Sequence, residues 1–332
     1  MSDPGSTVPA GTKLLRPDDA GIAEAAAILR AGGLVAFPTE TVYGLGGDAT
    51  DPAAVAGIYA AKARPSFNPL IAHVHDAAAA RIQGVFGDEA SRLADAFWPG
   101  PLTLVVPASA ETRVCDLARA GLPSVALRVP DDDATRALLA AFGRPLAGPS
   151  ANRSGRVSPT RAAHVLADLD GRIAAVLDGG DTQVGLESTV IACLAGPARL
   201  LRPGGITRDR LRAILGYDPA GPETTDAEAP VGPGLLASHY APNARVRLDV
   251  TRVAPGEALL LFGSFLPEGQ ETARARLNLS PAGNPAEAAA RLFGALRELD
   301  ASGAPTIAVA PIPPDGLGEA IRDRLVRAAA PR

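Results

Sequence analysis

Between residues 33 and 215, short apolar segments alternate with segments whose apolar residues recur at helical spacing. Residues 33–38 (GLVAFP) are almost wholly apolar and predict a buried strand. Asp51 and Pro52 predict the N-cap and first turn of a helix that ends near Lys62. We expect further strands at 70–74, 102–106, 124–129, 173–177 and 188–194, and further helices at 88–97, 132–142, 159–169 and 207–215. This alternation predicts an α/β fold.

The pattern changes after residue 215. Residues 216–243 are rich in Pro, Gly, Asp, Glu and Thr and lack periodicity, which is typical of a linker. Periodic segments then return: strands at 245–250, 257–262 and 306–311, a helix opened by Asn284 and Pro285, and a last helix at 317–328. The predicted units are a flexible tail (1–12), a large α/β domain (13–215), a linker or lid (216–244) and a small C-terminal α/β domain (245–332).

Composition narrows the class of protein. With 47% hydrophobic and 20% charged residues, the chain has enough apolar surface to build packed cores. No apolar run approaches the roughly 18 residues that span a bilayer, so we expect no membrane helix. Cys115 and Cys193 are far apart and indicate neither a disulfide framework nor a zinc site, which fits a cytoplasmic location. The net charge of −4 argues against broad nonspecific nucleic-acid binding but allows a local basic groove.

Polar residues gather where a predicted strand ends. Residues 37–48 (FPTETVYGLGGD) place Thr39, a second threonine and a glutamate between the buried strand and a glycine-rich turn. Ligands of α/β proteins bind at strand ends, although an ordinary β-turn has a similar composition. The chain contains no GxxxxGK[ST], GxGxxG, GxSxG or HExxH motif, so a nucleotide enzyme of this sequence must hold phosphates in another way.

Two cationic positions stand out. Lys13 and Lys62 are the only lysines among 32 basic residues, and Lys62 lies with Arg64 at a predicted helix end. A solvated helix end explains such a pair, but an ammonium also suits a single phosphate oxygen. Arg128 lies inside the otherwise apolar segment 124–130 (SVALRVP) and needs a partner, because an unpaired buried charge is strongly unfavourable. A structural salt bridge and a substrate carboxylate both fit it.

Later segments add hydroxyl, amide and glycine residues. In residues 148–160 (GPSANRSGRVSPT), small polar side chains are positioned to donate to phosphate, and Ser158 also matches a helix N-cap before proline. Residues 178–189 (DGGDTQVGLEST) and 200–205 (LLRPGG) contain glycines typical of close backbone approach. Tyr240, at the end of the linker, is a rare residue type here and is expected to pack on another group.

Six motifs occur in order over residues 14–215: FPTETVYGLG, KARP…NPLI, FWPGPLT, PSAN…SPT, GLEST and LRPG. Together they resemble the YrdC family, and the HYAP linker with the small second domain resembles its long, two-domain form, the threonylcarbamoyl-AMP synthases. The resemblance implies a twisted α/β sheet with helices and a concave basic groove. It also implies that L-threonine, bicarbonate and ATP give pyrophosphate and threonylcarbamoyl-AMP, which serves threonylcarbamoyladenosine modification of tRNA next to the anticodon.

The resemblance further implies roles for particular residues. Lys62 and Arg64 would be catalytic. ATP would be bound by Lys62, Arg64, Ser150, Asn152, Ser158, Arg202 and Tyr240, and threonine by Thr39, His73, Arg128 and Ser188. Magnesium would bind through phosphates and water, without a dedicated set of protein ligands. The expected partner is the tRNA threonylcarbamoyl transferase that accepts the intermediate, with tRNA contact weak or indirect.

Three alternatives stay open. A carbamoyltransferase of the hydrogenase-maturation type shares only the core, and two cysteines cannot form its zinc fingers. An RNA-binding module is a different class, and the acidic net charge argues against it. Within the favoured function, Tyr240 either belongs to a lid that closes over the nucleotide or only anchors the second domain.

Overall fold

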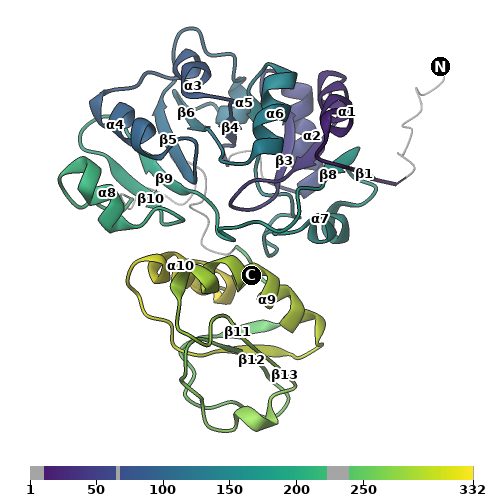
Figure 1. Cartoon of the computed structure of the whole chain (residues 1–332), viewed down its shortest axis with the longest axis vertical. Helices are drawn as coiled ribbons and strands as arrows, with labels where there is room; N and C mark the ends of the chain where they lie inside the picture. Colours follow the sequence, from purple (N-terminus) through teal and green to yellow (C-terminus); the bar gives the residue numbers. More distant parts are fainter. Residues whose placement is uncertain (1–10, 65–67, 223–238, 332) are drawn as a thin grey trace.

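The computed structural model describes residues 11–64, 68–222 and 239–331. Figure 1 shows two α/β parts: a large one built on strands β1 to β10 and a small one built on β11 to β14. Helices α9 and α10 of the small part lie between its own sheet and the large part. The predicted α/β fold with a second, smaller α/β unit is confirmed.

The large sheet is mixed and runs in the order β1-β8-β2-β3-β7-β4-β6-β5-β9-β10. Its strands are β1 Lys13–Leu15, β2 Val35–Phe37, β3 Gly44–Asp48, β4 Ile71–His73, β5 Leu102–Pro107, β6 Ser124–Arg128, β7 Leu146–Ala147, β8 Ala175–Leu177, β9 Thr189–Ala192 and β10 Arg199–Arg202. Alternate side chains of β2 enter different cores, since Val35 and Phe37 join one cluster and Ala36 joins another. This sheet is therefore covered on both faces at β2.

Four helices of the large part match their predicted bounds to within one residue: α2 Pro52–Lys62, α4 Asp88–Phe97, α6 Asp133–Phe142 and α8 Arg208–Leu215. Its other helices are α1 Asp19–Arg30, α3 Ala77–Gln83, α5 Asp116–Arg119 and α7 Ala162–Leu169. For α2 the Asp51 side chain accepts from the Ala53 amide, Pro52 follows it, and Ala63 ends the helix in the left-handed conformation. Helices α1 and α6 pack on one face of the sheet, while α2, α4, α7 and α8 contribute to the cluster on the other.

Two predicted local structures are wrong. The glycine-rich segment after the first strand is strand β3, because Gly44 and Gly46 let it pair closely with β2; a Cβ on Gly44 would lie 2.6 Å from the Phe37 ring. The helix expected from residue 159 begins only at Ala162 of α7, and Ser158 does not cap it. The Ser158 hydroxyl donates instead to Glu187, so tertiary contact overrides the local capping pattern.

The predicted tail and linker are described only in part. Most of the tail (1–10) and much of the linker (223–238) lie outside the described residues. Thr12, which was assigned to the flexible tail, is bound to the large part: its amide donates to Asp170 and its hydroxyl to the Ile173 carbonyl, each at 3.0 Å. The ordered structure therefore begins before β1.

The small part is a parallel sheet in the order β11-β14-β12-β13. Its elements are β11 Arg245–Arg247, β12 Ala258–Leu261, the short helix η1 Gln270–Thr272, β13 Ala275–Asn278, α9 Pro285–Ala301, β14 Thr306–Val309 and α10 Leu317–Ala329. Asn284 caps α9 and Pro285 opens it, as predicted. Strand β13 was not predicted because arginine and asparagine interrupt its apolar pattern.

The two parts share a hydrophobic core. Val42, Val157 and Leu186 of the large part belong to the same cluster as residues of α9 and α10. Gly185 has a φ of +69°, and a Cβ there would lie 2.5 Å from the backbone of Ala290 in α9. Close backbone approach at this glycine brings the small part against the large one.

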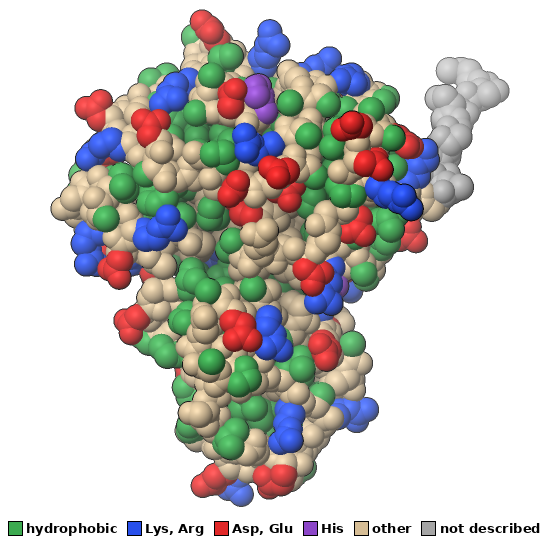
Figure 2. Space-filling model, viewed as in Figure 1, with side chains coloured by type: hydrophobic (Ala, Val, Ile, Leu, Met, Phe, Trp, Pro, Cys, Tyr) green, Lys and Arg blue, Asp and Glu red, His purple; other side chains and the backbone are tan. Residues whose placement is uncertain are grey.

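The surface charges and the helix lengths indicate what the protein contacts. In Figure 2, basic and acidic side chains are interspersed over both parts on the face shown. Within the described ranges, every helix is too short or too polar to cross a membrane.

Candidate active site

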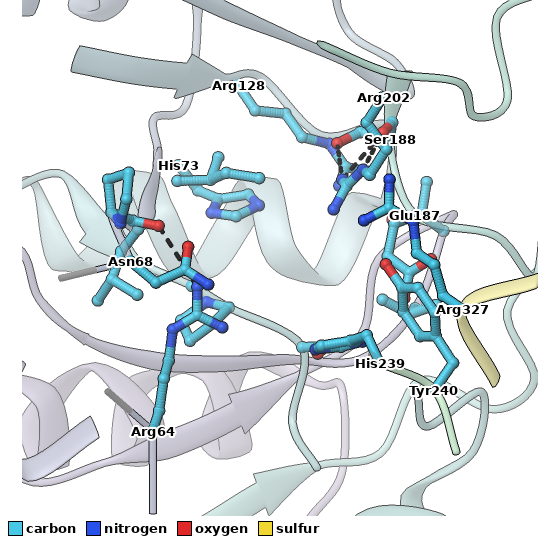
Figure 3. Close-up of a pocket in the computed structure, with 18 residues that line it drawn as sticks. Arg64, Asn68, His73, Arg128, Glu187, Ser188, Arg202, His239, Tyr240 and Arg327 are labelled. Carbon is cyan, nitrogen blue, oxygen red and sulfur yellow. Dashed lines mark hydrogen bonds between the residues drawn. The ribbon is translucent and has the colours of Figure 1, made fainter. Parts of the chain in front are cut away.

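A pocket lies where several strand ends of the large sheet meet the small part. Its wall contains Thr41, Val42, Arg64, Asn68, Pro69, Leu70, Ile71, His73, Arg128, Gly148, Pro149, Ser150, Glu187, Ser188, Arg202, His239, Tyr240 and Arg327. Figure 3 shows the labelled polar side chains converging from different elements around this space.

Strand register explains why distant residues meet here. Strands β4 and β6 are parallel, so their last residues, His73 and Arg128, are direct neighbours. Arg202 ends β10, which runs antiparallel to β9, and this brings it to Ser188 just before β9. The Arg202 guanidinium donates to the Ser188 carbonyl through Nε at 3.1 Å and Nη2 at 2.9 Å. The pocket thus forms at strand ends, as expected for an α/β protein.

The pocket wall is strongly basic. Four of its side chains are arginines (Arg64, Arg128, Arg202 and Arg327), against one carboxylate, Glu187. Burial lowers the pKa of Arg64 to about 10, so it stays charged at neutral pH. Such a wall favours a polyanionic ligand.

Glu187 is held in place by the two partners of its carboxylate. Its Oε2 accepts from Nε of Arg324 in α10 at 2.8 Å, and its Oε1 accepts from the Ser158 hydroxyl. Burial alone would raise the pKa of Glu187, but the charges of Arg324 and Arg202 and these hydrogen bonds hold the pKa below its ordinary value. Glu187 is therefore ionised and fixed at the pocket wall.

Arg128 has a structural partner and still faces the pocket. Its Nη2 lies 2.8 Å from Oε2 of Glu40, and both side chains are buried. The pair lacks hydrogen-bond geometry, and Nε and Nη2 of Arg128 have no hydrogen-bond partner within the described ranges. The salt bridge expected as one alternative therefore exists, while the donor capacity of Arg128 is not used up.

Other buried polar atoms of the wall share this property. Oδ1 of Asn68, Nδ1 of His73 and Nε of Arg64 have no hydrogen-bond partner among the residues that the structure describes. Burial, followed by the charge of Arg128, lowers the pKa of His73 to about 3, so this imidazole is neutral at physiological pH. Because buried polar atoms are nearly always paired, their concentration in one pocket indicates a polar ligand.

Seven predicted site residues line the pocket: Arg64, His73, Arg128, Ser150, Ser188, Arg202 and Tyr240. Four lie behind the wall: Thr39, Lys62, Asn152 and Ser158. The Thr39 hydroxyl donates to the Val42 carbonyl at 2.7 Å and orders the turn before β3.

Lys62 is buried and does not line the pocket. Its Nζ donates to the carbonyl oxygens of Ser150 and Asn152, so it holds the loop that carries Ser150. Burial, followed by the charge of Arg64, holds the pKa of Lys62 well below its ordinary value. The structure therefore gives Lys62 a clear role in loop position, and its expected contact with ATP stays a prediction.

Tyr240 has contacts on both sides. Its ring stacks on Phe293 of α9 with a centroid distance of 5.5 Å, and the Arg324 guanidinium lies 5.3 Å from its centroid. It is also part of the pocket wall. The expected packing of Tyr240 on another group is confirmed by its contact with Phe293, and its expected contact with ATP stays a prediction.

No role was assigned from the sequence to five polar residues of the wall: Thr41, Asn68, Glu187, His239 and Arg327. Asn68, Glu187 and His239 lie within the quoted motifs, and Asn and His are rare in this chain, so a signal existed for them. Arg327 is one of three arginines on the C-terminal helix, and nothing in the sequence marks it. Among the described residues, no group of three or more His, Cys, Asp or Glu side chains is arranged to hold a metal ion.

The chain matches known proteins over nearly its whole length. A family model described as "Telomere recombination" (Sua5, YciO, YrdC) matches residues 27–204, and one described as "Threonylcarbamoyl-AMP synthase, C-terminal domain" matches residues 206–330. The threonylcarbamoyl-AMP synthase of Bacillus subtilis is 41% identical over 97% of this chain and 96% of its own length. The threonylcarbamoyl-AMP synthase of Schizosaccharomyces pombe is 35% identical over 89% of this chain and 85% of its own length. The crystal structure of Pyrococcus abyssi Sua5 complexed with L-threonine matches with a TM-score of 0.86 at 35% identity, covering 96% of this chain and 97% of that one.

Proposed function

Because the chain belongs to the Sua5/YrdC family of threonylcarbamoyl-AMP synthases, we propose that its pocket joins L-threonine, bicarbonate and ATP into threonylcarbamoyl-AMP and releases pyrophosphate. The observation that carries this assignment is the set of buried, unpartnered polar atoms on Arg64, Asn68, His73 and Arg128, together with four arginines around one space. Such a site suits a small zwitterion beside a triphosphate.

Threonine binds at the ends of β4 and β6. The Arg128 guanidinium, whose Nη2 is ion-paired with Glu40 and whose Nε has no hydrogen-bond partner among the described residues, receives the threonine carboxylate. Neutral His73 and the Ser188 hydroxyl offer hydrogen-bond partners for the amino acid. Thr39 acts from behind the wall by ordering the segment that carries Thr41 and Val42.

ATP binds across the other arginines. Arg64 and Arg202 face the phosphates, and Ser150, whose loop is held by Lys62, lines the same pocket. Asn152 and Ser158 support this side from behind: the Asn152 amide donates to the Arg153 and Arg156 carbonyls at 2.8 and 2.9 Å, and Ser158 holds Glu187. Tyr240 packs beside the nucleotide.

The reaction needs orientation and charge rather than a protein nucleophile. The threonine amine attacks bicarbonate-derived carbon, a C–N bond forms, and water leaves to give the carbamate. A carbamate oxygen then attacks the α-phosphorus, the bond between the α-phosphorus and the bridging oxygen breaks, and pyrophosphate leaves. The arginines stabilise the negative charge that builds on the phosphates, and the enclosed pocket fixes the attacking atoms.

Magnesium enters as the counter-ion of ATP. Among the described residues that line the pocket, Glu187 is the only one with a carboxylate, and its oxygens accept hydrogen bonds from Arg324 and Ser158. Phosphate oxygens and water would therefore supply most of the magnesium ligands, as is usual for nucleotide-bound magnesium.

The product is a reactive mixed anhydride and needs an acceptor. We propose that a cytoplasmic tRNA threonylcarbamoyl transferase takes it for modification of the adenosine next to the anticodon. Direct tRNA binding is the alternative use of a basic pocket. A gel-shift series in rising salt separates the two, because direct RNA binding weakens steeply with salt.

The experiment that tests the function measures pyrophosphate release. Protein, ATP, magnesium and bicarbonate are mixed with L-threonine, D-threonine or glycine. Release with L-threonine well above the other two is the expected result. Equal release with all three contradicts threonine specificity, and release of inorganic phosphate alone contradicts attack on the α-phosphorus.

A further inference from the structure

The last helix of the chain reaches the active site. Helix α10 (Leu317–Ala329) buries Ala320, Ile321 and Leu325 in the core cluster that also contains residues of the large part. Arg324 and Arg327, three residues apart, lie on the same side of this helix. Neither arginine belongs to the motifs of the large domain, yet both meet pocket residues.

Arg324 joins three groups at the pocket. It is fully buried, and its Nε donates to Glu187 at 2.8 Å while its Nη1 donates to Asp323 at 2.6 Å. Its guanidinium also lies over the Tyr240 ring. A buried arginine needs such partners, and here they are the pocket carboxylate and the pocket aromatic residue.

Arg327 lines the pocket itself. Its Nε donates to Asp323 at 3.0 Å, so one carboxylate orients both arginines. The amide of His239 donates to the Arg327 carbonyl at 3.3 Å, which attaches the end of the linker to α10. In Figure 3, Arg327 lies beside Glu187 and Tyr240, with His73 on the other side of the pocket.

This position is distinct from the threonine side. Arg128 and His73, at the ends of β4 and β6, serve the amino acid, whereas Arg327 approaches from α10 next to Tyr240 and Arg202. The pKa values of Arg202, His239 and Tyr240 are shifted mainly by burial. The charge of Arg327 also affects each of them, to a smaller extent. A cation added at this end increases the positive charge where the phosphates lie.

We propose that Arg327 is a phosphate-binding residue supplied by the second part of the chain, and that Arg324 is the positioning residue that fixes Glu187 and Tyr240 beside it. The proposal rests on the proposed function, since it assigns this end of the pocket to the triphosphate. It gives the small part a direct place in the active site: Arg327 meets the phosphate chain as ATP binds and as pyrophosphate leaves.

The test is isothermal titration calorimetry of the full-length protein with ATP, pyrophosphate, AMP and L-threonine, each alone. Arg327→Ala is expected to weaken the binding of ATP and of pyrophosphate by about 10- to 100-fold, which is the usual effect of losing one charged hydrogen bond. Binding of AMP and L-threonine should be unchanged. Arg327→Lys should restore part of the loss, because it keeps the charge without the fork.

Arg322→Ala is the matched control. Arg322 lies on the same helix but pairs with Asp249 at 2.9 and 3.1 Å, away from the pocket. Wild-type affinities are expected for it. Equal ATP affinity in Arg327→Ala and Arg322→Ala overturns the inference, and so does an equal loss for L-threonine and ATP, which indicates a structural role. If the wild type binds neither ATP nor L-threonine, the proposed function fails first.

Discussion

Glu187 at the pocket wall and Arg324 in the last helix form a buried ion pair between the two parts of the chain, with Oε2 and Nε 2.8 Å apart. The pair fixes a pocket carboxylate from a helix that begins 130 residues later in the chain, at Leu317. Burial makes each charge depend on the other, because an isolated charge there is strongly unfavourable. The active site and the docking of the small part are therefore energetically linked.

The first prediction concerns this pair. Arg324→Met should lower the free energy of unfolding by about 3–5 kcal/mol, since it leaves Glu187 buried and unpaired. The double variant Glu187→Gln with Arg324→Met should recover part of the loss. Urea denaturation measures both, with Arg322→Met as the control for a half-buried arginine on the same helix that pairs with Asp249. Equal stability of Arg324→Met and Arg322→Met would show that the pair is not coupled.

The second prediction concerns threonine recognition. Arg128→Lys keeps the charge opposite Glu40 but loses the two-point contact that a guanidinium makes with a carboxylate. We expect kcat/KM for L-threonine to fall by about 10- to 100-fold with a thermal midpoint close to that of the wild type. Arg136→Lys, on the exposed side of α6, is the control. Unchanged kcat/KM in Arg128→Lys would remove Arg128 from the threonine site.

The third prediction separates two roles of Lys62. If Lys62 mainly holds the Ser150 loop, Lys62→Met weakens ATP and L-threonine together, whereas a direct phosphate contact affects ATP alone. In either case we expect activity to fall by about 100-fold or more. Lys13→Met removes the only other lysine, which is exposed and paired with Glu24, and should leave activity unchanged. Near-normal kinetics of Lys62→Met would contradict both roles.

The fourth prediction concerns pH. His73 has a folded pKa of about 3 against an ordinary value of 6.5, so the unfolded chain binds a proton that the folded chain does not. The stabilisation due to neutral burial of His73 is complete above pH 6.5 and is lost as pH falls toward 3, by about 1.4 kcal/mol per pH unit. Urea denaturation between pH 7 and pH 4.5 measures how the free energy of unfolding changes with pH. In His73→Gln this dependence should be weaker by the equivalent of one bound proton. Equal slopes would mean that His73 is protonated in the folded protein.

Much of the fold was predictable because its signals are local. Asp51 before Pro52 and Asn284 before Pro285 cap α2 and α9 as expected, and the apolar runs became buried strands. Strand β3 was not predicted because glycines close together in sequence are typical of turns. Gly44 is present for a tertiary reason, since the Phe37 ring on the neighbouring strand leaves no room for a side chain. The Ser158 cap failed for a similar reason, since a distant carboxylate is a stronger partner for its hydroxyl than the nearby amides.

The alternation of strands and helices, the motif set of the family and the residue types of a threonine- and ATP-using site can all be read from the sequence. Which of those residues face the pocket depends on the folded arrangement of the chain. It placed Lys62, Asn152, Ser158 and Thr39 behind the wall, and it brought Arg327 from the far end of the chain into the wall. The physical reason is that propensity and capping act between neighbours in sequence. Facing a pocket depends instead on strand register and on the packing of α10 against the large part, and both are set by contacts between distant residues.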